Sequence, residues 1–346
     1  MHMADALLAP AVAATMYVAS GAAAGTSIHT LRKSDEDAQK LPVMAVSAAL
    51  VFAGQMINYT IPGTGSSGHL CGGMLLSAIL GPQAGFLSMI VILAIQCLFF
   101  ADGGLLALGA NVWNMAFYGC FVGYYLIWRP IMRSSKLPAR TKIILASMIG
   151  CIVTLQLGAF SVVLETTLSG ITELPFGAFA GLMLPIHLAI GAVEGLITSA
   201  VLLFLYEARP ELLRDVEPDA AGAKAKFSLK ATVLVLAAVA LVVGGGLSLY
   251  ASGNPDGLEW ALFGNSEAGY AENMALDEED FGVSSSAADT AAAIQETTSF
   301  LPDYAFAESD SAAGTSVSGI VGSAMVAGVA VLICLAGGFF RKKRTS

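Results

Sequence analysis

Two histidines far apart in the chain, His2 and His69, have the surroundings best suited to binding a transition metal. The chain begins Met1-His2, and we expect Met1 to be retained because its removal generally needs a small second residue. The Met1 α-amine, the His2 amide if deprotonated, and the His2 imidazole can then bind one ion through small chelate rings. With His69 as the fourth nitrogen, this set suits the planar geometry of Ni(II) or Cu(II). The alternative is an unordered start followed by a chance histidine.

The stretch before His69 is rich in glycine, proline and hydroxyl residues over 62–68, which predicts a loop. The apolar run 70–80 predicts a short helix, so we expect His69 at or near a helix N-terminus. The partial positive charge there disfavours imidazolium and leaves the neutral ring that metal binding needs. The alternative is a histidine that only satisfies a loop carbonyl.

The composition predicts an all-α, polytopic integral membrane protein of the cell membrane. Hydrophobic residues make up 56% of the 346 residues and charged residues 12%, about half the usual ~25% of soluble domains. About nine apolar segments are expected to be helical: 6–30, 43–59, 70–80, 83–100, 105–128, 142–167, 177–205, 229–250 and 317–340. The segment 70–80 is too short to cross a bilayer alone.

The basic residues predict the orientation in the membrane. All 17 lie in four segments between or after the apolar runs: 32–40, 129–142, 209–230 and 341–344. Counting spans puts these segments on one side, which the positive-inside rule makes the cytoplasm, together with the C-terminus. The N-terminus, the loop 60–69, Asp102 and the segment 251–316 are then expected outside. His2 and His69 therefore share the outer face.

The chain divides into three parts by composition. We expect a transmembrane core at 1–205, a cytoplasmic linker at 206–228 and a two-span module at 229–346. In the two-span module, the segment expected outside the membrane is 251–316. It holds half of the 26 acidic residues and no basic one. An ordered docking element is expected at 255–260 and disorder from about 264 to 316. This acidic stretch either concentrates cations near an entrance or is a solubilising linker.

Several polar residues in or near the apolar spans are candidates for supporting or gating a site: Ser67, Asp102, Asn111, His187 and Glu194. His187 and Glu194 are seven residues apart, so they share one helix face. The alternative for Asn111 and Glu194 is interhelical hydrogen bonding that only holds the bundle together. The five cysteines lie inside apolar runs without a CxxC motif and are expected to be buried hydrophobes.

Enzyme and nucleic-acid motifs are missing from the sequence. It has no GxxxxGK[ST] loop, no HExxH and no basic patch interleaved with aromatics, so ATP hydrolysis by a P-loop and nucleic-acid binding are not expected. One enzymatic alternative is a rhomboid-like intramembrane serine protease, since Gly65-Ser66-Ser67-Gly68 fits a GxSG pattern and His187 lies on a later helix. That alternative leaves His2, His69 and the acidic segment unexplained.

At these motifs the chain resembles the substrate-capture membrane subunit of cobalt and nickel energy-coupling-factor transporters. The matching features span about residues 1–205: Met1-His2-Met3 with Pro10, Ser67-Gly68-His69-Leu70, Gly81-Pro82, Phe100–Gly104 with Leu108–Val112, and His187 with Glu194–Thr198. Residues 229–346 resemble the small companion subunit of these transporters, marked by Pro255-Asp256-Gly257-Leu258-Glu259. The long acidic segment departs from the short loop expected of that subunit.

The resemblance implies a function and partners. It implies a Ni²⁺ or Co²⁺ site formed by the Met1 amine, the His2 amide and imidazole, and the His69 imidazole, with no other cofactor. It also implies a transmembrane coupling subunit and cytoplasmic ATPases as partners, in keeping with the missing P-loop. Square-planar nitrogen ligation favours nickel, but the sequence leaves Co²⁺ open, as it does a role in cobalamin synthesis or in supplying a nickel enzyme.

Overall fold

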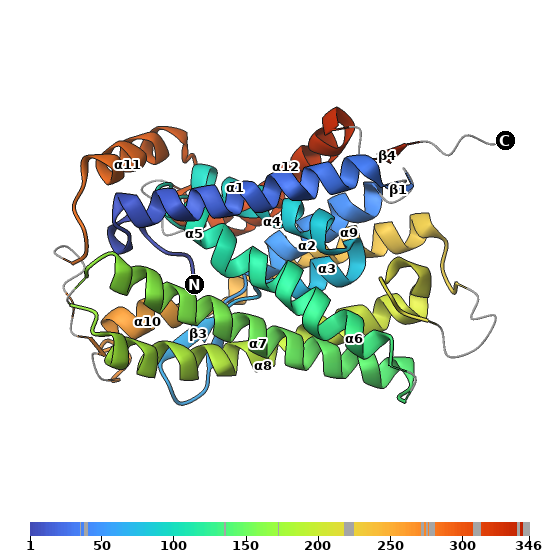
Figure 1. Ribbon diagram of the computed structural model, residues 1–346, viewed down its shortest axis with the longest axis horizontal. Coiled ribbons are helices and arrows are strands. Elements are labelled where there is room, and N and C mark those ends of the chain that lie inside the picture. Colours follow the sequence, from blue (N-terminus) through green and yellow to red (C-terminus); the bar gives the residue numbers. More distant parts are fainter. Residues whose placement is uncertain are drawn as a thin grey trace.

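A computed structural model describes most of the chain, at residues 1–34, 36–37, 41–134, 136–171, 173–217, 225–270, 273–274, 276, 281–306, 313–337 and 340–341. Nearly all regular structure in these ranges is helical, in keeping with the all-α expectation (Figure 1). The first half contains η1 (Asp5–Leu7), α1 (Pro10–Lys33), α2 (Leu41–Gln55), α3 (Gly73–Leu80), α4 (Pro82–Phe100), α5 (Leu108–Asn111), η3 (Val112–Trp128) and α6 (Arg129–Met132). The second half contains α7 (Ala139–Leu168), α8 (Phe176–Ala208), η4 (Pro210–Leu212), α9 (Leu229–Gly245), η5 (Leu247–Tyr250), α10 (Gly257–Phe263), α11 (Ser286–Thr298), η6 (Pro302–Tyr304) and α12 (Ala313–Gly337).

Two short strand pairs accompany the helices. β2 (Tyr59–Ile61) and β3 (Ser66–Gly68) form an antiparallel hairpin in which Thr60 pairs with Ser67. β1 (Glu36–Asp37) and β4 (Phe340–Arg341) pair in parallel. The hairpin lies beside α10, and its second strand leads directly to His69.

Six helices in the described part of the chain are long and apolar enough to cross a membrane. They are Pro10–Lys33, Pro82–Phe100, Ala139–Leu168, Phe176–Ala208, Leu229–Tyr250 and Ala313–Ala336. Helix α3 has only 8 residues and is joined to α4 through Gly81, as expected for a segment too short to cross alone. The number of nine apolar segments and the direction of insertion stay predictions.

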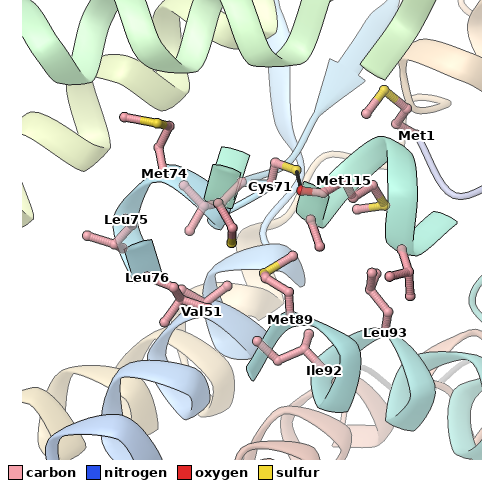
Figure 2. Close-up of a cluster of buried hydrophobic side chains, with 14 of the residues drawn as sticks. Met1, Val51, Cys71, Met74, Leu75, Leu76, Met89, Ile92, Leu93 and Met115 are labelled. Atoms are coloured by element: carbon pink, nitrogen blue, oxygen red, sulfur yellow. Dashed lines mark hydrogen bonds between the residues drawn. The ribbon is translucent and has the colours of Figure 1, made fainter. Parts of the chain in front are cut away.

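The helices pack as a bundle whose apolar centre lies between α2, α3, α4 and η3. Figure 2 shows this centre, where Met74 from α3, Met89 from α4 and Met115 from η3 surround Cys71. All five cysteines are buried and free, in keeping with the expectation of small hydrophobes. In the second half, α9 and α12 pack against each other and against α2, so the C-terminal module is part of the same bundle (Figure 1).

His69 lies near the start of a helix but not at it, since the N-cap of α3 is Gly72. His69 and Leu70 continue the chain beyond β3, and α3 starts only at Gly73. Two contacts delay the helix: the Glu194 carboxylate accepts hydrogen bonds from the backbone N–H groups of Cys71 (3.0 Å) and Gly72 (2.9 Å). Gly72 has φ +86°, which favours glycine.

The expected disorder after residue 264 is wrong for the described part of that segment. Residues 286–298 form α11, which Ser285 caps by accepting the Ala288 N–H at 3.1 Å. Gln295 fastens α11 to the core, since its amide donates to the Cys97 and Gly103 carbonyls at 3.0 and 2.9 Å. Parts of the acidic stretch, among them 277–280 and 307–312, lie outside the described residues.

Candidate metal centre

The first three residues run into the bundle and are held there by Asn111 (Figure 1). The Asn111 Oδ1 accepts from the Met3 N–H at 2.7 Å, and its Nδ2 donates to the Met3 carbonyl at 3.1 Å. That carbonyl also accepts from the Gly104 N–H at 2.9 Å, and the Met3 side chain is fully buried. The position of the N-terminus is therefore set by backbone bonds at residue 3.

Met1, His2 and His69 meet at this point. The Met1 amine nitrogen lies 3.4 Å from His69 Nε2, although 68 residues separate them. The imidazole rings of His2 and His69 are stacked, with centroids 5.2 Å apart and planes inclined by 21°. His69 Nδ1 lies 3.0 Å from the Leu70 carbonyl, so this ring nitrogen donates and Nε2 is left to accept or to bind a metal.

Both ring nitrogens of His2 have side-chain partners. Nδ1 lies 3.1 Å from Asp102 Oδ1, and Nε2 lies 3.3 Å from Gln96 Oε1. Burial, opposed by the Asp102 carboxylate, lowers the pKa of His2 to about 4. The imidazole is thus neutral at pH 7, as metal binding requires. Gln96 is a neighbour that sequence reasoning missed, because a glutamine in an apolar helix has no distinctive pattern.

Sequence reasoning also missed Asp256 as part of this centre. Its Oδ2 forms an ion pair with the Met1 amine and lies 3.8 Å from His69 Nε2. Burial opposes ionisation, but the Met1 ammonium and His69 outweigh it and hold the pKa of Asp256 well below its usual range. The sequence around Asp256 predicts only a helix cap, because Asp256 and Glu259 form a capping box at the start of α10. It does not indicate a contact with Met1.

The other candidate residues have distinct positions. Asp102 accepts from the Tyr304 hydroxyl at 2.5 Å as well as contacting His2. His187 donates from Nδ1 to the Met183 carbonyl at 2.8 Å, and its buried Nε2 has no hydrogen-bond partner among the described residues. With Met1, His69 and Asp256 it lines a cavity of about 10 Å³, roughly the space of one water. Glu194 lies below the site and holds the 71–72 turn.

Ser67 does not pair with His187. Its hydroxyl lies 2.8 Å from the Asn254 carbonyl and 3.2 Å from that of Pro255, both of which accept from it. A serine protease needs the serine to donate to its histidine base. The rhomboid-like alternative is therefore not supported.

The described part of the chain contains no group of three His, Cys, Asp or Glu side chains placed to hold a metal ion. At Met1, His2 and His69 the nitrogen donors besides the two imidazoles are main-chain ones, the Met1 amine and the His2 amide. The separation of 3.4 Å between the Met1 amine and His69 Nε2 suits the binding of one ion. One ion bound to two nitrogens at about 2 Å leaves them roughly 2.8 to 4 Å apart, depending on the angle at the metal.

Two family models match the chain, and known proteins resemble it. A family model described as cobalt uptake substrate-specific transmembrane region matches residues 2–212, and a PDGLE domain model matches residues 230–337. The chain is 36% identical over 331 residues to a putative fused nickel transport protein NikMN of Archaeoglobus fulgidus, covering 94% of this chain and 95% of that protein. It is 31% identical over 214 residues to the cobalt transport protein CbiM of Sorangium cellulosum, covering 62% of this chain and 94% of that one.

The fold is also similar to a solved structure. A crystal structure of a truncated transition metal transporter has a TM-score of 0.52 and 35% sequence identity, and the match covers 60% of this chain and 99% of that one. The spans, the family models and these relatives agree with one another. The chain therefore belongs to the family of cobalt uptake substrate-specific transmembrane proteins, as a multi-pass membrane protein of metal transport that carries a PDGLE domain at its C-terminal end.

Proposed function

We propose that this protein captures Ni²⁺ or Co²⁺ at its outer face with four nitrogens: the Met1 amine, the His2 amide, the His2 imidazole and His69 Nε2. The observation that carries the proposal is the meeting of the Met1 amine, His2 and His69 inside the bundle, with the amine 3.4 Å from His69 Nε2. A buried chain terminus that faces two imidazoles offers an ion nitrogen donors from both chain segments.

Loading requires one local rearrangement at His2. The small chelate ring through the His2 amide closes at Nδ1, and this atom now faces Asp102 at 3.1 Å. The ring must therefore exchange Asp102 for the ion. With Nδ1 on the ion, the remaining ring N–H is at Nε2, which lies 3.3 Å from Gln96 Oε1, so Gln96 would be the supporting partner of the ligating ring. Asp102 would stay nearby as a negative charge.

Transport across the membrane is proposed to need partner subunits. The sequence has no P-loop, and its relatives include proteins named as cobalt and nickel transport proteins. We infer that a transmembrane coupling subunit and cytoplasmic ATPases drive the inward step, as in energy-coupling-factor transporters. A planar set of four nitrogens favours Ni²⁺ over Co²⁺.

Metal titration of the full chain with its native N-terminus tests the proposal. Isothermal titration with Ni²⁺ and with Co²⁺ should give one tight site, and His69→Ala should abolish tight binding while the protein remains folded. His29→Ala is the matched control, because His29 lies on α1, away from this site. Equal affinities of the parent and the His69 variant would refute the proposed ligand set.

A further inference from the structure

The PDGLE domain is fastened to the loop that leads to His69 by a row of hydrogen bonds. The Ser67 N–H donates to the Pro255 carbonyl at 2.8 Å, and the Trp260 indole N–H donates to the Thr64 carbonyl at 2.8 Å. Asn265 adds a bond to the Gly65 carbonyl at 2.7 Å. The start of α10 is thus held in a fixed place beside the metal centre.

Within this contact the two carboxylate oxygens of Asp256 bind different partners. Oδ1 accepts from the N–H groups of Leu258 and Glu259 at 2.8 and 2.9 Å, and the Glu259 side chain accepts from the Asp256 N–H at 3.1 Å. This capping box fixes the side-chain orientation. Oδ2 is left to face the Met1 amine and His69 Nε2.

Gly257 permits this close approach. A Cβ at residue 257 would lie 2.9 Å from Ile190 Cδ1 and 3.0 Å from His187 Cε1, closer than ordinary contact. A side chain at residue 257 would therefore force Ile190 or His187 to move, and His187 lines the same cavity as Met1, His69 and Asp256. Asp256 thus supplies the charged group beside the Met1 amine. The absence of a side chain at Gly257 leaves room for the close packing of α10 there.

We propose that Asp256 is a positioning residue of the metal site, supplied by the PDGLE domain, which holds the Met1 amine beside His69 before and after the ion binds. This inference rests on the proposed capture of Ni²⁺ or Co²⁺. On binding a metal the Met1 ammonium loses one proton to solvent, and the bound amine still carries two N–H bonds, so Oδ2 can continue to accept one of them. The carboxylate also places a negative charge next to the cation.

The expected loss of metal affinity follows from this supporting role. Loss of a partner that orients a metal ligand typically costs about 10- to 100-fold in metal affinity. Among the described residues, the hydrogen-bond partners of the Met1 amine are Asp256 and His69, and His69 is itself a proposed ligand. No other partner there can take over the role of Asp256. We therefore expect an effect of that size when the charge of Asp256 is removed.

The test compares variants of the full chain with its native N-terminus. Asp256→Asn removes the charge, and Asn is as good a helix N-cap as Asp, so α10 should persist. Glu259→Gln is the matched control, because it removes one negative charge from the same capping box without touching the amine. Trp260→Phe removes one docking bond and leaves the carboxylate. Ni²⁺ affinity is measured by isothermal titration, and the ligand set by the d–d absorption bands at saturation.

We expect Asp256→Asn to weaken Ni²⁺ binding about 10- to 100-fold with unchanged absorption bands, and the Glu259 and Trp260 variants to lose clearly less. Parental affinity in Asp256→Asn would overturn the inference, as would an equal loss in Trp260→Phe, which would mean that docking alone matters. Shifted bands would also overturn it, by making Asp256 a direct ligand. A His69→Ala variant in the same series separates the two proposals. Parental affinity there refutes the proposed metal site itself, whereas weak binding there with normal Asp256→Asn binding refutes only the role of Asp256.

Discussion

Inserting two glutamines between Met1 and His2 tests whether the N-terminal amine is a ligand, and a large second residue such as glutamine keeps Met1 in place. Residue 3 cannot slide to compensate, because Asn111 bonds both its N–H (2.7 Å) and its carbonyl (3.1 Å). The added residues must therefore displace the amine. Two insertions are better than one, because a histidine in third place would give an amine, two amides and an imidazole, again four nitrogens in a plane.

The size of the displacement decides the expected effect. Two extended residues add up to ~7 Å of chain, whereas a metal–nitrogen bond tolerates about 0.2 Å. The amine that now lies 3.4 Å from His69 Nε2 could no longer share an ion with it. Losing a ligand outright should exceed the 10- to 100-fold cost of losing a supporting contact. We expect at least a 100-fold loss of Ni²⁺ affinity, about 2.7 kcal/mol.

Isothermal titration of the purified parent and insertion variants measures this loss directly. A tag at the C-terminus is the control for an added segment as such, and should leave the affinity unchanged. Accumulation of radioactive Ni²⁺ in cells that also express the partner subunits gives a second readout. Parental affinity in the insertion variant would refute the amine as a ligand and leave His2 to act through its side chain alone.

Four further predictions follow from the same contacts. Asn111→Ala should lower both Ni²⁺ affinity and the melting temperature, because the buried Met3 N–H that it leaves unpaired costs about 1–3 kcal/mol; titration and thermal unfolding measure this. Changing Ser66 and Ser67 together to Ala should keep metal uptake within a few-fold and reveal no proteolytic activity, since hydroxyls are poor ligands for these ions. Burial lowers the pKa of His2 from 6.5 to about 4, so unfolding takes up a proton in this range and stability should fall as the pH falls from 6.5 to 4; His2→Gln should flatten that part of a melting-temperature profile. A protease site inserted after the exposed Glu267 should be cut from outside intact cells, whereas cutting only in inverted vesicles would reverse the predicted orientation.

The sequence was sufficient to bring His2 and His69 together, because the signal was global. Basic residues confined to four segments predicted that both histidines share one face, and their rings are 5.2 Å apart in the structure. The all-helical bundle was predictable for a similar reason, since long apolar runs in lipid must satisfy their backbone groups within a helix. Their roles as ligands stay a prediction.

Contacts between distant segments were not predictable in this way. Asp256 lies 255 residues from the Met1 amine that it contacts, and its local pattern indicates only a helix cap. The start of α3 at Gly73 depends on Glu194, which reaches the turn from another helix. The composition around α11 is that of a disordered linker, yet the single side chain of Gln295 makes three hydrogen bonds to the 97–105 backbone. In each case the deciding partner is far away in the sequence.

The fusion of two modules in one chain gives these distant contacts a physical basis. If Asp256 and Tyr304 came from a separate subunit, their contacts with the Met1 amine and with Asp102 would depend on its concentration. A covalent connection makes docking intramolecular, with an effective concentration that reaches the millimolar range for short connections. Docking strength and metal affinity should then be coupled, because each stabilises the same arrangement of Met1 and His69. Weakening the Trp260–Thr64 bond would accordingly lower Ni²⁺ affinity further in a protein split between the modules than in the fused chain.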